Sequence, residues 1–573
     1  MSKALLSGDE AIARGAWEAG VKVAAAYPGT PSTQILENLV KYPDVYSEWS
    51  TNEKVALEVA LGAALSGVRS LCAMKHVGLN VAADALFSSA YIGVRAGMVI
   101  VSADDPGLHS SQNEQDNRFY GLSAKVPVLC PADSEEAKEY TKLAFEISEE
   151  FDIPVILRIT TRIAHSKTIV NLGDRRDIRK GTYIKDITKT NLLPQFAKGR
   201  HYSLEERLRR LKEYSNTTPI NKIIPGKKSL GIIADGVAYQ YAREVFPNAS
   251  FLKLGMVYPF PEQLVREFAQ NKNKIYVIEE TDPFLELLAR SCGIKVIGKT
   301  ALPLVDELNP RIVRNAFRRR KINFEPEKDL PPRPPALCPG CPHSGLFYLL
   351  QRKDLVISGD IGCYTLGTYP PHNAMDSCVC MGASITLAHG IDKALKGEKK
   401  VVSVIGDSTF FHMGVTGLIN AVYNKSKQIL IILDNRTTGM TGHQEHPGTG
   451  RTLMGEETTA IRPEDIARAC GIKEIYVIDP YEIKENRALF SELLKKDELV
   501  VLVSRRACAL LGGRKPPLQI ILDKCTGCKM CLRIGCPAIT FSEGHAVINT
   551  SLCVGCEMCL KLCPSEAIVK TES

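Results

Sequence analysis

The amino-acid sequence predicts an α/β protein with several doubly wound parallel sheets and a small α+β domain at its C-terminus. Two observations support this prediction. Through most of the 573 residues, apolar stretches of strand length alternate with segments of helical periodicity, as in parallel sheets covered by helices. The residues after 516 instead carry eight cysteines at short intervals. A chain of this length has room for roughly four domains.

The boundaries of these domains follow changes in composition along the chain. We predict an α/β unit over residues 1–165, with helices at 11–19 and 53–67 and strands at 21–26, 68–73, 97–103 and 154–159. A polar connecting segment follows over 166–227, with one helix at 204–214.

A second α/β unit covers 228–325, with strands at 229–234, 274–279 and 295–297. The proline-rich stretch 331–335 is predicted to be a stiff linker at the start of the third α/β unit. That unit covers 326–515, with strands at 400–405, 428–433 and 498–503, and the cysteine-rich domain covers 516–573.

Composition restricts the class of protein. The chain has 18 cysteines, and neither an export signal nor an apolar run of about 18 residues is found, so we expect a cytoplasmic protein with ligating thiols rather than disulfides. The formal charge of +8 comes from short basic runs without interleaved aromatic residues. We therefore expect no nucleic-acid or membrane binding.

The cysteine-rich end contains two similar runs, Cys525-x2-Cys528-x2-Cys531-x4-Cys536-Pro and Cys553-x2-Cys556-x2-Cys559-x3-Cys563-Pro. They resemble the ligand pattern of two-cluster ferredoxins, in which the fourth cysteine of each run binds the other [4Fe–4S] cluster. This implies one cluster on Cys525, Cys528, Cys531 and Cys563, and a second on Cys553, Cys556, Cys559 and Cys536. A zinc ribbon is the alternative, although zinc needs neither the third cysteine nor the repeated Cys-Pro. The first run has one extra residue in 532–535, which predicts a longer and less firmly held loop to Cys536.

In the third unit, Gly406-Asp407 ends a predicted strand and Asn435 follows the next. This pair resembles the metal–diphosphate motif of thiamine diphosphate enzymes. The carboxyl ends of parallel strands are where α/β sheets bind ligands, and Mg²⁺ prefers carboxylate and phosphate oxygens. Asp407, the Asn435 amide and the Thr437 carbonyl are the candidate Mg²⁺ ligands. Ser408 stands where glycine is more usual, and an ordinary strand-end turn is the alternative.

Segments around this motif resemble the 2-oxoacid:ferredoxin oxidoreductases. They are Cys338-Pro-Gly-Cys341, Gly359-Asp-Ile-Gly-Cys363 and the stretch from Asp434 to Gln444. The resemblance implies a third [4Fe–4S] cluster near the thiamine, on Cys338, Cys341, Cys363 and a fourth cysteine. Cys508 is the first candidate for that place, with Cys378 and Cys380 as rivals. A small structural zinc site or free thiols are the alternative.

The first unit resembles the other half of the same family. In Tyr27-Pro-Gly-Thr30-Pro-Ser-Thr, the resemblance assigns Thr30 to the 2-oxoacid. In Asn52-Glu53-Lys54 with Gly62-Ala63, it assigns Glu53 to N1′ of the aminopyrimidine, as a general acid–base group. Glu53 could otherwise be an ordinary partner of the helix dipole. His76 and His412 fall in segments expected to face the cofactor, and either could be a core histidine.

One departure from the family concerns the substrate. Members that act on pyruvate carry an arginine after the third strand, where this chain has Asp104-Asp105. The order of units resembles the large α subunits of the indolepyruvate:ferredoxin oxidoreductases, a branch of this family. The resemblance implies oxidative decarboxylation of aryl pyruvates to aryl-acetyl-CoA, with CoA and an external ferredoxin as co-substrates. It also implies a hetero-oligomer with a small β subunit that carries a γ-type domain.

Three other functions remain compatible with the same motifs: a different 2-oxoacid specificity, a non-oxidative thiamine-dependent decarboxylase, and a pure electron-transfer subunit with α/β scaffolds. The cluster ligands disfavour the second, and the thiamine motif disfavours the third.

Overall fold

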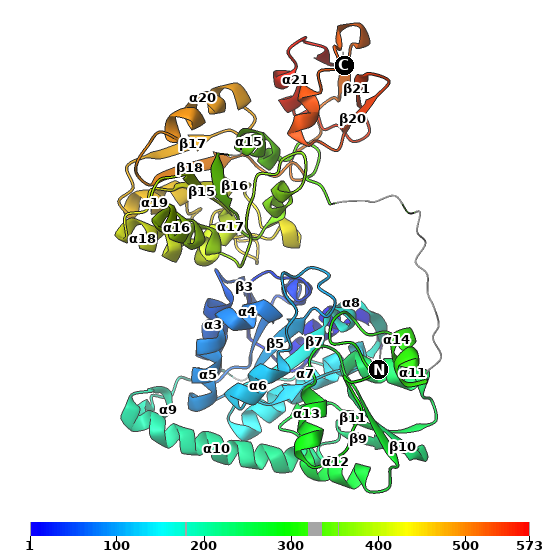
Figure 1. The fold of residues 1–573 in the computed structure, drawn as a ribbon. Helices are drawn as coiled ribbons and strands as arrows, with labels where there is room; N and C mark the ends of the chain where they lie inside the picture. Colours follow the sequence, from blue (N-terminus) through cyan, green and yellow to red (C-terminus); the bar gives the residue numbers. More distant parts are fainter. Residues whose placement is uncertain (1, 178–179, 319–329, 331–334, 353, 572–573) are drawn as a thin grey trace. The chain divides into compact units, whose positions relative to one another are not determined.

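The computed structural model describes residues 2–177, 180–318, 330, 335–352 and 354–571. The chain forms two compact units, residues 1–326 and 327–573 (Figure 1). The predicted proline-rich linker at 331–335 falls almost entirely outside the described residues. No helix among the described residues is long and apolar enough to cross a membrane.

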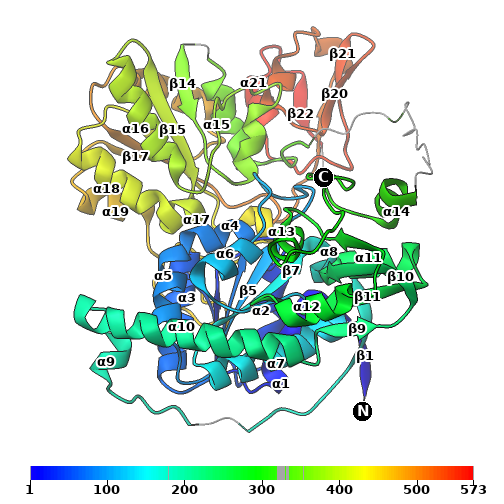
Figure 2. The ribbon, with the colours of Figure 1, turned by 60° about the horizontal axis from the view of Figure 1, so that its bottom comes forward.

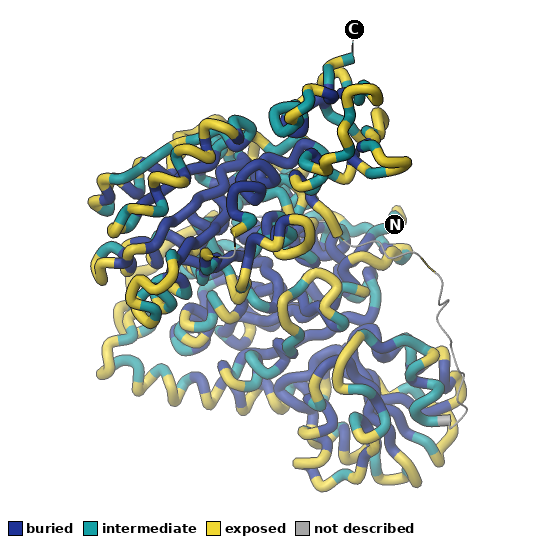
Figure 3. Tube along the Cα trace, turned by 45° about the horizontal axis from the view of Figure 1, so that its top comes forward, coloured by how far each residue is buried: buried dark blue, intermediate teal, exposed yellow. Residues whose placement is uncertain are grey.

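The first unit is built on a seven-stranded sheet in the order β12-β6-β7-β5-β4-β2-β3. All neighbouring strands are parallel except β12, which pairs antiparallel with β6 at the edge. The strands are β2 (Val23–Ala26), β3 (Tyr46–Trp49), β4 (Ser70–Lys75), β5 (Met98–Asp104), β6 (Val128–Leu129), β7 (Val155–Thr160) and β12 (Met256–Tyr258). The central strands β4, β5 and β7 are buried along their whole length, as strands covered on both faces must be (Figure 3).

Helices cover both faces of this sheet. Helix α1 (Gly8–Glu18) packs against α2 (Thr33–Leu39) and α7 (Ser134–Phe151), while α3 (Glu53–Leu65) packs against α4 (His76–Val81) and α5 (Ala83–Ile92). Each strand is followed by a helix that crosses to the next parallel strand, which is the doubly wound arrangement that the sequence predicts. The segment after each strand therefore begins at one common edge of the sheet, its carboxyl edge.

The polar segment at 166–227 is more ordered than the sequence predicts. Strand β8 (Lys167–Asn171) pairs antiparallel with β1 (Lys3–Ser7). The single helix expected at 204–214 is the end of a longer helix, α10 (Pro194–Thr217), which contacts α5, α7 and α12 (Glu262–Ala269) (Figure 2). Its polar first turns gave no apolar periodicity. Arg200 in these turns and Arg207 farther along the helix both donate from their guanidinium groups to the backbone carbonyl of Tyr91, which holds α10 against the unit.

The remaining part of this unit holds a four-stranded sheet in the order β13-β10-β11-β9. Its strands are β9 (Lys222–Ile224), β10 (Lys227–Asp235), β11 (Ala249–Leu254) and β13 (Lys274–Ile278). The strand predicted at 295–297 is wrong, because only Ile297 pairs there, in a single bridge with Tyr276. The apolar pair Val296 and Ile297 suggested a strand, but the segment is too short to add a ladder of hydrogen bonds.

The second unit is built on a five-stranded parallel sheet in the order β14-β15-β16-β18-β17. Its strands are β14 (Leu355–Ser358), β15 (Lys400–Gly406), β16 (Ile429–Asp434), β17 (Ile475–Ile478) and β18 (Val500–Arg505). Helices α16 (Ala383–Leu395) and α18 (Val415–Tyr423) pack together, and α15 (Pro342–Leu350) packs with α20 (Ile483–Leu493). The cysteine-rich end adds two short antiparallel pairs, β19–β22 and β20–β21, at 518–520 with 568–570 and at 539–542 with 545–548.

Candidate active site and iron–sulfur sites

The residues predicted in the first unit lie along the carboxyl edge of its sheet. Thr30 is in the loop between β2 and α2, Glu53 is the first residue of α3, and His76 is the first residue of α4, directly after β4. Glu53 and His76 are buried, at 5% and 0% exposure. The Nε2 atom of His76 lies 3.1 Å from the backbone carbonyl of Asn113. The other ring nitrogen, Nδ1, is buried and has no hydrogen-bond partner among the described residues, so the ring is not fully bonded as a core histidine would be.

Glu53 is held in place by a close approach to α4. A Cβ added at Gly78 would lie 2.6 Å from Cγ of Glu53 and 2.7 Å from its Oε1. Only a residue without a side chain leaves room for the Glu53 carboxyl group there. The helix that carries Glu53 starts with a side-chain cap, because the Asn52 amide oxygen accepts from the N–H of Val55. The carboxyl group is therefore positioned by both elements.

The acidic pair at the end of β5 is engaged within the unit. Asp104 accepts from Nε of Arg158 at 2.8 Å, and both side chains are buried. Asp105 accepts from the hydroxyl groups of Ser111 and Thr161, at 2.6 Å each. These bonds explain why the pair is acidic: both carboxylates connect β5 to neighbouring segments.

In the second unit, Asp407 and Asn435 follow neighbouring strands, β15 and β16, and both are buried. Oδ1 of Asp407 accepts from the N–H of Ser408, and Oδ2 accepts from the N–H of Arg436. The amide oxygen of Asn435 accepts from the N–H of Thr437 at 3.3 Å. The two side chains that the sequence proposes as Mg²⁺ ligands therefore end at one edge of one sheet. Their oxygen atoms are of the type that Mg²⁺ prefers.

The Ser408 side chain accounts for the departure from glycine at that position. The hydroxyl group of Thr438 donates to the Ser408 hydroxyl at 2.9 Å, which joins the turns that follow β15 and β16. The serine therefore supports the loop that carries Asn435 and Thr437.

Sequence reasoning missed His446. Its Nε2 lies 3.2 Å from Oδ2 of Asp407, and the ring is buried. The N–H of Gly448 donates to Nδ1, so in the neutral ring the proton is on Nε2, the nitrogen that faces the carboxylate. No motif marked this histidine, because it comes from a loop eleven residues beyond Asn435 and reaches Asp407 only in the fold.

The cysteines proposed for the third cluster come together beside this site. Burial raises the pKa of Cys363, and the neighbouring thiols of Cys508 and Cys338 raise it further. The same three thiols act on buried Cys341, whose pKa is also raised first by burial. The N–H of Cys508 donates to the backbone carbonyl of Asn435 at 3.0 Å.

The rivals for the fourth place have other neighbours. Burial raises the pKa of Cys378, which interacts with Thr365, Asp360 and Cys380 rather than with the first group. In the described structure, Cys508 is therefore the cysteine that lies with Cys338, Cys341 and Cys363.

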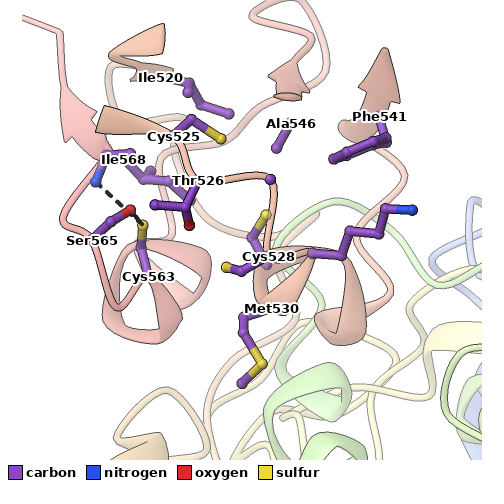
Figure 4. Close-up of a pocket in the computed structure, with 14 residues that line it drawn as sticks. Ile520, Cys525, Thr526, Cys528, Met530, Phe541, Ala546, Cys563, Ser565 and Ile568 are labelled. Carbon is purple, nitrogen blue, oxygen red and sulfur yellow. Dashed lines mark hydrogen bonds between the residues drawn. The ribbon is translucent and has the colours of Figure 1, made fainter. Parts of the chain in front are cut away.

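The first predicted ferredoxin set surrounds one small cavity (Figure 4). Four cysteines line it: Cys525, Cys528, Cys531 and Cys563. The rest of the lining includes apolar residues, Ile520, Phe541, Ala546 and Ile568, and polar ones, Thr526, Lys529 and Ser565. The N–H of Ala567 donates to Sγ of Cys563 at 3.2 Å, and backbone N–H groups of Ala546 and Gly527 lower the pKa of Cys525. Such donors favour the thiolate form, which is the form that binds iron.

The second predicted set surrounds another cavity. Cys536, Cys553, Cys556 and Cys559 line it, together with Pro339 and Gly340 of the Cys338–Cys341 turn. Gly340 has φ +71°, and a Cβ added there would lie 2.4 Å from Cγ2 of Val554. The turn that carries two cysteines of the third set therefore touches the wall of the second cavity.

No three His, Cys, Asp or Glu side chains in the described ranges converge as the ligands of a single metal ion do. The four thiolates of a [4Fe–4S] cluster bind four different irons, so they surround a cavity rather than a point.

The longer loop before Cys536 is not loosely held, contrary to the expectation from its length. The side-chain amide of Gln351 donates to the backbone carbonyl of Arg533 at 2.8 Å, and the Arg533 guanidinium lies over the ring of Tyr348. A Cβ added at Gly535 would lie 2.5 Å from Nε2 of His372. The extra residue thus lets the loop pack against the thiamine-type part of the same unit.

Comparisons with known proteins identify the families to which parts of this chain are similar. Residues 14–196 match the family described as pyruvate flavodoxin/ferredoxin oxidoreductase, thiamine diP-binding. Residues 360–504 match the thiamine pyrophosphate enzyme C-terminal TPP-binding domain, and residues 546–569 match the 4Fe-4S binding domain. These matches define a 2-oxoacid:ferredoxin oxidoreductase that uses thiamine diphosphate and iron–sulfur clusters.

Relatives that match this chain over nearly its full length show to which branch of the family it belongs. Indolepyruvate oxidoreductase subunit IorA of Archaeoglobus fulgidus is 43% identical over 100% of this chain and 98% of its own length. The IorA subunit of Methanothermobacter marburgensis is 44% identical over 98% and 96%. 2-Oxoglutarate synthase subunit KorA of Methanothermobacter thermautotrophicus is 24% identical over 48% of this chain and 86% of its own. The chain belongs to the family of IorA subunits, which confirms the resemblance found in the sequence.

Proposed function

We propose that this protein oxidatively decarboxylates indolepyruvate and related aryl pyruvates to aryl-acetyl-CoA and CO₂, and passes the two electrons singly to ferredoxin. Thiamine diphosphate supplies the carbon chemistry, while the protein supplies orientation, proton transfer and redox partners. The observation that carries the proposal is the arrangement in the second unit. There the backbone of Cys508 is bonded to Asn435, next to Cys338, Cys341 and Cys363. A redox group beside the cofactor is what separates oxidative from non-oxidative decarboxylation.

Two observations support aryl substrates. The IorA relatives are named for indolepyruvate. The arginine expected after β5 in a pyruvate enzyme is replaced by Asp104-Asp105, and both carboxylates are bonded to neighbouring segments. That position therefore has no arginine to pair with the carboxylate of pyruvate.

We propose these roles for the cofactor residues. Asp407, the Asn435 amide oxygen and the Thr437 carbonyl hold Mg²⁺, with Gly406 beside the diphosphate. Glu53 bonds N1′ of the aminopyrimidine and moves the proton that activates the thiazolium ring. Thr30 contacts the 2-oxoacid. His76 is a further catalytic candidate: the Asn113 carbonyl fixes its Nε2, and its buried Nδ1 has no hydrogen-bond partner among the described residues.

For the clusters we propose three [4Fe–4S] groups. One is held by Cys338, Cys341, Cys363 and Cys508, and the other two by the crossed ferredoxin sets. Because Pro339 and Gly340 line the second cavity, electrons would pass from the third cluster to the one on Cys536. They would then reach the cluster whose ligand Cys528 is exposed, where an external ferredoxin can approach.

The complete enzyme is proposed to be a cytoplasmic hetero-oligomer. The relatives are named as subunits, which supports a partner chain. A small β subunit with a γ-type domain and CoA as the acyl acceptor are the partners implied by the family. The domain boundaries at 165, 227, 325 and 515 are proposed from the changes in composition along the chain.

A substrate panel tests the proposal. The enzyme, assembled with its partner subunit, is assayed anaerobically with indolepyruvate, phenylpyruvate, pyruvate and 2-oxoglutarate, with CoA and a viologen or ferredoxin acceptor. Aryl pyruvates should give the highest kcat/KM, with acyl-CoA as product. A preference for pyruvate would overturn the aryl assignment, and aldehyde formed without acceptor reduction would overturn the oxidative one.

A further inference from the structure

The carboxyl edge of the first sheet contains a buried cation that makes no direct ion pair and interacts with the Asp105 carboxylate only at a distance. Lys75 is the last residue of β4 and is 8% exposed. Its Nζ donates to the backbone carbonyl of Ser110 at 2.5 Å. Among the described residues, this carbonyl is its one hydrogen-bond acceptor, and no carboxylate lies within 4.0 Å of it. An ammonium group has three N–H donors, so two of them are left for a ligand.

Other buried cations of this unit are already paired. Arg158 is bonded to Asp104, and Arg118 makes ion pairs with Asp116, Asp235 and Glu279. Burying a charge without a partner is costly, so such groups are normally paired. Lys75 shows that cost, because burial lowers its pKa to about 8 although the Asp105 carboxylate acts in the opposite direction. The exception suggests that a negatively charged ligand completes the site.

The neighbours of Lys75 are those expected around the 2-oxoacid. A Cβ added at Gly29 would lie 3.1 Å from Cβ of Lys75, so the lysine stem packs on the loop that carries Thr30. The hydroxyl group of Ser110, whose carbonyl binds Lys75, lies 3.4 Å from the carbonyl of Thr30. Three residues after Lys75, Gly78 makes the close approach to Glu53. The lysine therefore lies between the candidate substrate loop and the candidate acid–base group.

We propose that Lys75 binds the carboxylate of the 2-oxoacid, in place of the arginine that this chain lacks after β5. The inference rests on the proposed function and adds to it the residue that recognises the substrate's charged end. The ammonium group donates to the substrate carboxylate while it keeps its bond to Ser110. Asp104 pairs with Arg158, and Asp105 acts on Lys75 only at a distance, so the N–H donors of Lys75 stay available to this ligand.

The test compares Lys75→Met, Lys75→Gln and Lys75→Arg in the assembled enzyme. Charged hydrogen bonds contribute about 1.5–3 kcal/mol, so the first two variants should raise KM for phenylpyruvate roughly 10- to 100-fold. Glutamine can still donate to the Ser110 carbonyl, so it separates loss of charge from loss of the loop contact. Arginine should recover part of the affinity. Lys41→Gln removes an exposed lysine of the same unit, bonded to Asn38, and should behave as wild type.

Binding measurements without turnover complete the test. The inhibition constant of 3-phenylpropionate should rise in Lys75→Gln, while that of its uncharged amide should not change. Retention of thiamine diphosphate and KM for CoA should stay at wild-type values. A Lys75→Gln enzyme with wild-type KM for phenylpyruvate would overturn the proposal, as would a rise confined to CoA or thiamine diphosphate. Wild-type enzyme that turns over no aryl pyruvate would instead refute the proposed function.

Discussion

Replacing Gly78 with alanine tests whether the position of the Glu53 carboxyl group controls turnover. The added Cβ would lie 2.6 Å from Cγ, 2.7 Å from Oε1 and 2.9 Å from Cδ of Glu53. Non-bonded carbons pack at ~3.5–4.0 Å, so the Glu53 side chain must move by about 1 Å. A misplacement of about 1 Å in a catalytic constellation can lower the rate roughly 100-fold.

The expected effect on stability is small by comparison. Overpacking costs about 1–3 kcal/mol, and replacing a helical glycine with alanine recovers roughly 0.5–1 kcal/mol. Gly62→Ala is the matched control: it lies in α3, the helix that carries Glu53, and no atom lies within 4 Å of the position of its added Cβ. Gly62→Ala should be more stable by roughly 0.5–1 kcal/mol, because alanine favours a helix over glycine, and it should keep full activity.

The assay is viologen reduction with phenylpyruvate and CoA, alongside thermal melting and thiamine content. The kcat of Gly78→Ala should fall about 100-fold while the enzyme keeps its cofactor. Glu53→Gln, which removes the carboxyl group itself, is the reference variant, and its kcat should fall ~10²–10⁴-fold. Wild-type kcat in Gly78→Ala beside an inactive Glu53→Gln would show that the close approach does not position the carboxyl group. Full activity in Glu53→Gln would remove Glu53 itself from the mechanism.

Three further predictions concern the second unit. Asp407→Ala should abolish thiamine diphosphate retention while iron content stays unchanged, because Mg²⁺ loses its charged protein ligand; wild-type thiamine content would refute the metal assignment. Cys536→Ser should perturb only one ferredoxin-type EPR signal, and two unchanged signals with unchanged oxygen sensitivity would refute the crossed ligation. Gln351→Ala should make the cluster on Cys536 more sensitive to air by releasing the Arg533 carbonyl, whereas Arg352→Ala, which removes an exposed pair with Asp354, should not. Equal air sensitivity of Gln351→Ala and wild type would show that this contact does not hold the loop.

Much of the fold follows from local patterns in the sequence. Buried strands such as β5 and β16 are continuous apolar runs between helical segments, and the expected bounds differ from the observed ones by a residue or two. The errors occur where tertiary contacts decide the structure. Helix α10 begins in a polar stretch that arginine–carbonyl bonds hold, and β12 joins the first sheet although it comes from the predicted second unit.

The same difference is found in the candidate site. The residues proposed to bind ligands could be predicted from the sequence, and the residues that position them could not. The cysteine sets and the Asp407–Asn435 pair could be proposed from spacing, because each ligand belongs to a short motif with a fixed geometry. His446, Gly78 and Lys75 could not, since each is recognised only by its contact with a residue distant in sequence and carries no motif of its own. The loop before Cys536 shows how this can mislead. Its extra residue suggests slack when counted along the chain, but in the fold it reaches Gln351 and His372 and becomes an anchor. Of the two proposed ferredoxin sites, the one on Cys525, whose candidate ligand Cys528 is exposed, is therefore the one that solvent and oxygen should reach first.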